Sequence, residues 1–236
     1  MSATLQAMTF LASKKPFADG SVSFGGDGTS DTLRVTSAAG GFPVGSDSRQ
    51  FEFWAKIDST YTTWSNIFSY GASSAGACFG LNIRNNQNTN FSFTGFSSGD
   101  ISGIGPQVSG YVNAWHHYCL TYDGTTVEFF IDGTSQGTGT RTLDTGGTVF
   151  PIGGSEHSGF GENFKGLIYN FRVLENVLYT SNFTVPTSAL TATSQGASGC
   201  VLLCCQDSNN ITDAAVKPGN LTAHGSSITG STDKPF

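Results

Sequence analysis

The sequence predicts an all-β protein, an antiparallel jelly-roll sandwich of two sheets, and three observations lead to this prediction. Charged residues make up 12% of the 236 residues, against about 25% in typical soluble domains. Gly (31 residues) and Phe (19 residues) are abundant, whereas Met (2 residues) is scarce. Gly-rich and Asp-Gly turns separate short runs of β-forming residues. Few helix formers and many aromatic, β-branched and turn residues favour short strands joined by tight turns.

The strongest local signal is a pair of hairpins in the middle of the chain. Asp123-Gly124 and Asp132-Gly133 flank the run TTVEFFI, and Asp-Gly suits the positive φ angles that tight hairpin turns require. Alternation along this run directs its Val and Ile towards the core and leaves Phe130 on the other face. We therefore expect that face to be partly covered. The expected strands of this meander are residues 117–122, 126–131 and 135–138.

The other strands follow in order by the same logic. Each is a run of aromatic or β-branched residues bounded by Gly, Asn, Ser or Asp. Strands that recur every 8–12 residues with turn signals between them are typical of a sandwich or jelly roll. The expected strands are residues 21–25, 31–36, 50–57, 66–70, 79–84, 90–94, 149–152 and 166–173.

The pattern divides the chain into three parts. Residues 1–20 form an N-terminal arm, residues 21–192 the jelly roll, and residues 193–236 a C-terminal extension with one expected strand at 200–205. Beyond the apolar run CVLLCC the extension is polar and Gly-rich, too poor in apolar residues to form a core of its own. We therefore expect at least one terminal segment to pack on a neighbouring subunit or on another protein.

Charge and hydrophobicity argue against two classes of partner. The net charge is −6, and the 11 Lys and Arg residues are scattered, whereas nucleic-acid-binding domains cluster basic residues to neutralise phosphates. No apolar run approaches the ~18 residues of a membrane span. The N-terminus lacks the pattern of a signal peptide, so we expect synthesis in a reducing cytosol. The five cysteines show no metal-site spacing.

The order of several motifs resembles a known family. SVSFGGDGTSDTLRV, FEFWAKID and the Trp-His-His that precedes the first Asp-Gly hairpin resemble the laminin-G-like, concanavalin A-like jelly-roll family over residues 21–192. The closing stretch GLIYNFRVLENVLYTSNFTVPTSALTA is similar to proteins of marine bacteriophages, particularly those that infect cyanobacteria. This resemblance implies a virion protein, assembled in the host cytoplasm beside other virion proteins and copies of itself.

The acidic residues and histidines do not form an enzyme motif. Glucanases of the same fold carry a Glu-x-Asp-x-x-Glu strand, and retaining hydrolysis needs two carboxyl groups ~5–5.5 Å apart. None of the five Glu residues stands in that pattern. His116 and His117 are adjacent, so a strand directs them to opposite faces. We therefore expect no enzymatic activity, with a polysaccharide-degrading enzyme as the alternative of another class.

Calcium is the metal that the sequence brings into consideration. Asp27 and Asp31 lie in the turn GGDGTSD, and Glu156 lies in GGSEHSG. Some relatives of the family bind calcium at one rim, and calcium takes six to eight oxygen ligands. Asp residues in Gly-rich turns more often cap their own backbone, so the sequence favours no cofactor over a calcium site.

Aromatic residues in polar, loop-like surroundings are candidates for stacking against sugar rings. The five candidates are Tyr61, Trp64, Phe96, Tyr111 and Phe160. The alternative interpretation of each is a contact with the core or with another subunit. The function predicted from the sequence is therefore a virion structural protein, a display or docking module on the capsid or tail. The alternative is a carbohydrate-binding adhesin that recognises a glycan on the host surface.

Overall fold

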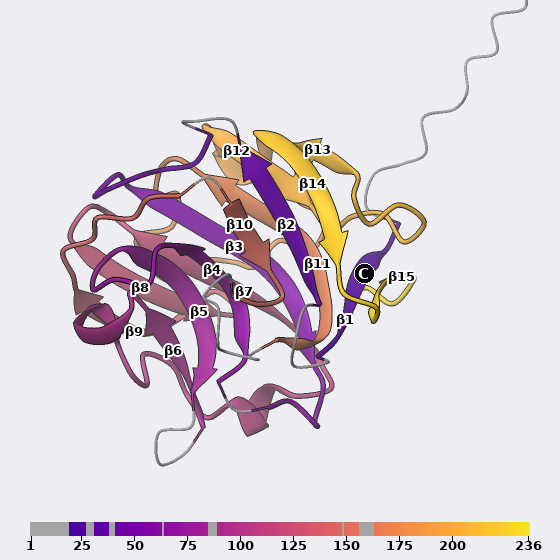
Figure 1. The fold of residues 1–236 in the computed structure, drawn as a ribbon, viewed down its shortest axis with the longest axis horizontal. Coiled ribbons are helices and arrows are strands. Elements are labelled where there is room, and N and C mark those ends of the chain that lie inside the picture. The colour runs from indigo at the N-terminus through magenta and orange to yellow at the C-terminus, as the bar shows by residue number, and fades with distance from the viewer. Residues whose placement is uncertain are drawn as a thin grey trace, which may run out of the picture.

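The computed structural model describes residues 19–26, 31–37, 41–62, 64–84, 89–147, 149–155 and 163–236, and in them two antiparallel sheets face each other (Figure 1). One sheet has the order β13-β12-β11-β3-β7-β8-β9, with β1 beside β11 and β15 beside β1, and the other has the order β14-β2-β10-β4-β5-β6. The predicted all-β, two-sheet sandwich is confirmed.

The nine-stranded sheet consists of β1 (Ser21–Gly25), β3 (Arg49–Ile57), β7 (Trp115–Tyr122), β8 (Thr126–Ile131), β9 (Thr134–Thr140), β11 (Lys165–Leu174), β12 (Cys200–Cys204), β13 (Ala214–Val216) and β15 (Ile228–Ser231). The six-stranded sheet consists of β2 (Thr32–Ser37), β4 (Asn66–Gly71), β5 (Cys78–Arg84), β6 (Asn90–Thr94), β10 (Val149–Ile152) and β14 (Gly219–His224). Three 3₁₀ turns lie outside the sheets, η1 (Ser97–Gly99), η2 (Val108–Tyr111) and η3 (Ser194–Gly196).

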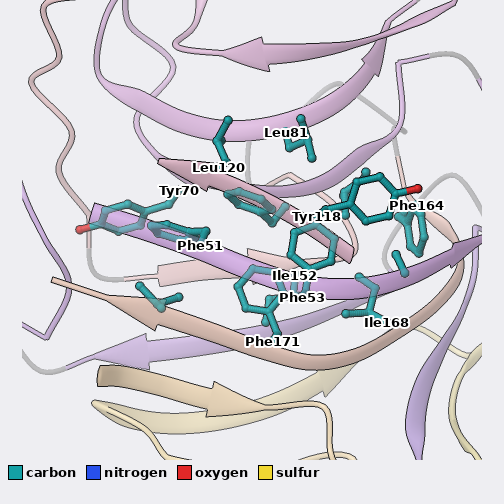
Figure 2. Close-up of a cluster of buried hydrophobic side chains, with 14 of the residues drawn as sticks. Phe51, Phe53, Tyr70, Leu81, Tyr118, Leu120, Ile152, Phe164, Ile168 and Phe171 are labelled. Carbon is teal, nitrogen blue, oxygen red and sulfur yellow. The ribbon is translucent and has the colours of Figure 1, made fainter. Parts of the chain in front are cut away.

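The core between the sheets is built largely from Phe side chains (Figure 2). The rings of Phe53 on β3 and Phe171 on β11 stack with centroids 4.9 Å apart, and Phe51 stacks on Phe68 of the opposite sheet at 5.1 Å. All four side chains have no exposed surface. Burial of a Phe side chain contributes roughly 1.5–3 kcal/mol, so this layer accounts for much of the attraction between the sheets.

The two Asp-Gly hairpins join β7, β8 and β9 as expected. Gly124 (φ 104°) and Gly133 (φ 74°) both adopt positive φ, which glycine tolerates without steric cost. The ladder pairs Tyr118 with Ile131 across β7 and β8. The expected cover over Phe130 is also present, because the ring of Phe183 lies 5.5 Å from it.

The C-terminal extension differs from the expectation of a single strand. β12 lies where the sequence predicts it, but β13 pairs with β12, β14 pairs with β2, and β15 pairs with β1. Figure 1 shows these yellow strands along both sheets. The extension was missed because an edge strand is held by backbone hydrogen bonds, which any residue except Pro supplies. It needs few apolar side chains, and Leu221 is the one buried hydrophobic residue of β14. The arm residues 1–18 lie outside the described residues.

Candidate functional site

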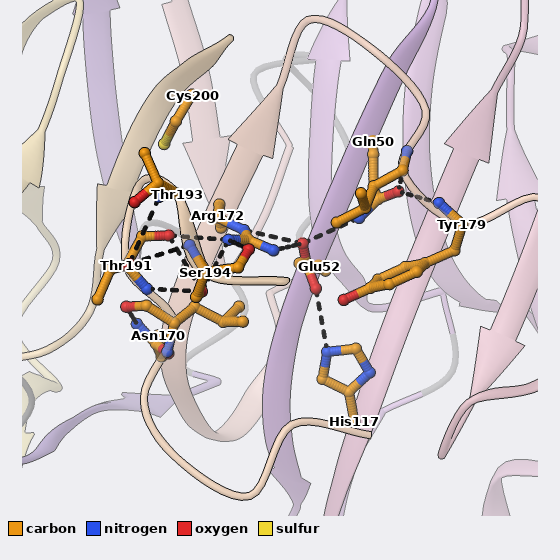
Figure 3. A network of polar contacts seen from close by, with 12 residues as sticks. Gln50, Glu52, His117, Asn170, Arg172, Tyr179, Thr191, Thr193, Ser194 and Cys200 are labelled. Carbon is orange, nitrogen blue, oxygen red and sulfur yellow. Dashed lines mark hydrogen bonds and ion pairs between the residues drawn. The ribbon is translucent and has the colours of Figure 1, made fainter. Parts of the chain in front are cut away.

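A carboxylate on the outer face of the nine-stranded sheet is the first group to consider for chemistry. Oε1 of Glu52 accepts hydrogen bonds from Nε (2.9 Å) and Nη2 (2.6 Å) of Arg172 and from Nε2 of Gln50 (2.9 Å). Its other oxygen, Oε2, lies 3.4 Å from Nε2 of His117, a long polar contact. Figure 3 shows these contacts, which we call the buried ion network (Gln50, Glu52, His117 and Arg172).

The buried ion network is closed to ligands. The Glu52, His117 and Arg172 side chains have no exposed surface, because the segment between β11 and β12 lies over them. Arg172 donates to the carbonyl oxygens of Thr191 (2.8 Å) and Ser194 (3.1 Å), and thereby fixes that segment to the sheet. Burial acts to raise the pKa of Glu52, but the polar contact with His117 and the charge of Arg172 outweigh it and hold that pKa below its usual range. The network therefore fixes the covering segment to the sheet, and its charged side chains are not exposed to solvent.

Exposed aromatic surface is found instead at the rim beyond β3. Trp64, in the loop between β3 and β4, is 39% exposed. Its φ angle is +72°, a region that costs a non-glycine residue about 1–3 kcal/mol and that often marks functional positions. A backbone hydrogen bond from its N–H to the carbonyl oxygen of Ile83 (2.7 Å) holds this conformation. The indole is therefore presented on a fixed backbone.

Arg84, at the end of β5, lies against that indole. Its guanidinium carbon is 4.9 Å from the centroid of the Trp64 ring, within the range of a cation–π interaction. Nη1 of Arg84 pairs with Oδ2 of Asp100 (2.6 Å) and contacts Oγ of Ser102 (3.4 Å). Nε and Nη2 are left with no partner in the described part of the chain. We call Trp64, Arg84 and Asp100 the Trp64 platform.

Asp100 holds the platform in place through several contacts. Its Oδ1 accepts hydrogen bonds from the backbone N–H of Gly95 (3.1 Å) and the hydroxyl of Thr94 (3.3 Å). Arg141 Nη2 donates to the carbonyl oxygen of Asp100 (2.6 Å). The carboxylate is thus oriented towards Arg84, so that the guanidinium has a fixed direction and two unused donor positions.

Of the four described aromatic residues that were named from the sequence, Trp64 is the exposed one. Tyr61 is in the same loop as Trp64 but is half-buried and packs against the core. Tyr111 is also half-buried, with its ring 5.9 Å from Phe91 and 5.0 Å from His116. Phe96 directly follows Gly95, whose N–H donates to Oδ1 of Asp100 (3.1 Å), so its backbone lies close to that member of the platform and beside the turn between β4 and β5. Phe160 lies outside the described residues.

The residues considered for calcium are not assembled into a site among the described residues. Asp31 has no exposed surface, and its Oδ1 accepts a hydrogen bond from the backbone N–H of Ser227 (3.0 Å), which ties the C-terminal extension to the sandwich. Asp27 and Glu156 lie outside the described residues. In the described ranges no group of three or more His, Cys, Asp or Glu residues has the arrangement of a metal site.

Arg84 and Asp100 were missed by sequence reasoning. They are 16 positions apart, and no local motif links them. The available signal was the single charged residue at the end of the alternating strand CFGLNIR, whose alternation directs it away from the core.

The described ranges also hold no helix with the length and apolar character that crossing a membrane requires.

Several solved protein structures superpose on this fold. A candidate carbohydrate-binding protein from Bacteroides ovatus superposes with a TM-score of 0.65 at 14% identity, over 92% of this chain and 60% of that protein. A heptameric SAP-like pentraxin from Limulus polyphemus superposes with a TM-score of 0.59 at 16% identity, over 90% of this chain and 94% of that one.

A third solved structure is domain 4 of the extracellular arabinanase AbnA from Geobacillus stearothermophilus, in complex with arabinotriose. Its TM-score is 0.50 at 22% identity, over 66% of this chain and 73% of that one. At such identities the likeness shows the fold alone. A comparison with curated protein sequences finds no match. Residues 18–182 match the family described as the concanavalin A-like lectin/glucanases superfamily. Since that match covers more than half of the chain, the protein belongs to this superfamily.

Proposed function

We propose that this protein is a non-enzymatic carbohydrate-binding module and that the glycan binds at the Trp64 platform. The apolar face of a sugar ring stacks on the exposed indole, and sugar hydroxyls accept hydrogen bonds from Nε and Nη2 of Arg84. The observation that carries the proposal is Trp64 itself, a large aromatic side chain that is 39% exposed on a backbone with a φ of +72°. An exposed aromatic residue with an apolar face and an adjacent polar group suits an amphipathic ligand.

Two further observations support a binding function. The carboxylate of the outer sheet face that is best placed for chemistry, Glu52, has no exposed surface. Domain 4 of AbnA, which shares the fold, was solved with arabinotriose. A sandwich of this kind presents its rim loops to ligands on a rigid scaffold.

The experiment is a glycan array with the purified protein, followed by titration calorimetry with the best oligosaccharide. Truncation of a central aromatic residue typically removes about 2 kcal/mol of binding free energy, or roughly 30-fold in affinity. We expect that loss for Trp64→Ala. The control is Val44→Ala, because Val44 is also exposed (45%) but lies at the other end of β3, beside Arg49. Equal affinities of the two variants, or an array without any bound glycan, would contradict the proposal.

We also propose that the module belongs to a bacteriophage virion, on the capsid surface or the tail, and serves there as a display and docking unit. The support is the similarity of residues 166–192 to marine phage proteins described above. Its partners are then other virion proteins, copies of itself and a host surface glycan. Mass spectrometry of purified particles, with imaging of a labelled chain, tests this role. If the protein is absent from mature particles, the virion role is ruled out and the glycan-binding proposal is unaffected.

A further inference from the structure

A second concave site lies away from the Trp64 platform, where the C-terminal extension crosses the ends of β1, β3 and β11. It is a cavity of about 280 Å³, with Phe24, Ile57 and Leu167 among its lining residues. This volume is close to the lower end of the ~300–1,000 Å³ of small-molecule sites, which are mostly apolar with a few polar groups. We call it the C-terminal pocket. Its size suits a single small ring and not a long chain.

The C-terminal extension supplies one wall of this pocket through Asp233. The Asp233 side chain accepts hydrogen bonds from Nζ of Lys56 (2.9 Å) and Nε1 of Trp115 (2.8 Å), and its carbonyl oxygen accepts one from Oγ of Ser21 (2.6 Å). The extension lies beyond residues 18–182, the part of the chain that matches the superfamily. One wall of the pocket therefore comes from a segment outside the matched part of the chain, and the remaining lining residues lie within it.

The charges that line the pocket are balanced. Two lysines and two aspartates contribute to its wall. Lys56 pairs with Asp233 at 2.9 Å, and the second lysine, Lys165, lies close enough to Asp58 to help keep the pKa of Asp58 low, after the larger effect of the hydrogen bonds from Thr60. Because no net charge is left to be neutralised, the lining does not favour an ionic ligand over an uncharged one.

The polar lining offers donors and an acceptor together. Within the described part of the chain, the Asp58 side chain accepts hydrogen bonds from the N–H and hydroxyl of Thr60, both at Oδ1, and Oδ2 has no partner there. Asn113 accepts one from Ser59 N–H at Oδ1 (3.3 Å), and its Nδ2 has no acceptor among the residues that the structure describes. Nζ of Lys165 donates one hydrogen bond, to Thr60 (2.6 Å). A hydroxyl group both donates and accepts hydrogen bonds. A ligand with several hydroxyls can therefore bond to the acceptor and to the donors of this lining.

We propose that the C-terminal pocket binds one neutral monosaccharide unit, independently of the Trp64 platform. The apolar lining of Phe24, Ile57 and Leu167 covers the C–H face of the sugar. Its hydroxyls donate to Oδ2 of Asp58 and accept from Nδ2 of Asn113 and Nζ of Lys165.

The test uses Asp58→Asn in the full-length protein. Asn keeps an oxygen for the hydrogen bonds from Thr60 but replaces the free acceptor with a donor. The matched control is Asp123→Asn, because Asp123 makes the same pair of bonds with the N–H and hydroxyl of Thr125 (2.8 and 2.9 Å) in the turn between β7 and β8. Ligand-observed NMR titrations with D-glucose, D-galactose, D-mannose and L-arabinose measure binding.

We expect saturable binding of at least one of these sugars, a loss of about tenfold in affinity for Asp58→Asn, and no change for Asp123→Asn or Trp64→Ala. The retained binding of Trp64→Ala separates this pocket from the glycan platform. Absence of saturable binding by the wild type, equal losses in the two Asn variants, or loss in Trp64→Ala would each overturn the proposal. Tighter binding of glucuronate than of glucose would overturn the assignment to a neutral sugar.

Discussion

Two arginine–carboxylate pairs, one on each sheet, have the same nitrogen–oxygen distance of 2.6 Å but different surroundings. Arg172 and Glu52 on the nine-stranded sheet have no exposed side-chain surface. The side chains of Arg84, at the end of β5 in the six-stranded sheet, and of Asp100 are 22% and 11% exposed. Removing one member of a buried pair leaves an uncompensated charge in a medium of low polarity, whereas water solvates a partly exposed one.

The two guanidinium groups also differ in how many of their nitrogens donate hydrogen bonds within the protein. Nε, Nη1 and Nη2 of Arg172 all donate within the protein. Of the Arg84 nitrogens, Nη1 alone donates to a residue in the described ranges. The distance between the charged groups therefore does not distinguish a structural pair from a binding pair, but exposure and unused donors do. The following predictions test this distinction.

The largest expected effect is on folding stability, in Glu52→Gln. Breaking a buried ion pair typically costs about 3–5 kcal/mol, so we expect a loss in that range, measured by urea unfolding. Glu175→Gln is the control, because Glu175 is exposed, and it should change the stability by less than about 0.5 kcal/mol. Similar losses in both variants would show that Glu52 is not a structural anchor.

The loss of folding stability in acid should depend on the same residue, Glu52. The pKa of Glu52 is lowered from 4.5, so its contribution is complete above that value and is lost as the pH falls through the lower pKa of the folded state. Unfolding free energies of the wild type should therefore decrease in this acid range, and those of Glu52→Gln should decrease less. Exposed carboxylates with lowered pKa values, such as Asp123 and Asp233, account for the remaining slope. Parallel curves for the two proteins would contradict the assignment.

A smaller loss of stability is expected for Asp100→Asn. The amide oxygen keeps the hydrogen bond from Gly95, and only the charge pair with Arg84 is weakened. We expect about 1.5 kcal/mol from the loss of a charge-assisted hydrogen bond, together with weaker glycan binding because Arg84 is no longer held. A loss of stability as large as that of Glu52→Gln would contradict the distinction between the buried pair and the partly exposed pair.

The smallest expected effect is the difference in folding stability between two substitutions of Trp64. At a φ of +72° glycine is favoured over alanine by about 1 kcal/mol, so Trp64→Gly should be more stable than Trp64→Ala by that amount. Both variants should lose glycan binding. Thermal unfolding and calorimetry together check this result, and an alanine variant as stable as the glycine variant would show that this backbone is not strained.

Several features were predictable because their cause is local. The Asp-Gly turns require positive φ, and alternation of apolar residues identifies the inward face of β3 and β8. Trp64 was named from the sequence because it stands in a polar loop. The partners that give these residues their roles were not predictable. Glu52 and Arg172 are 120 positions apart, and Lys56 and Asp233 are 177 apart, so their contacts depend on which strands become neighbours.

The sequence by itself determined the all-β class, the strands described in residues 21–192 to within a few residues at their ends, both hairpins and the apolar face of each sheet, since turn chemistry and side-chain alternation act over a few residues. The tertiary structure alone decided that the extension completes both sheets, that Glu52 is sealed while Arg84 keeps unused donors, and that Asp233 closes a pocket. These outcomes depend on backbone pairing and on burial. Backbone hydrogen bonds carry almost no information about side chains, and burial is a property of the whole packed molecule.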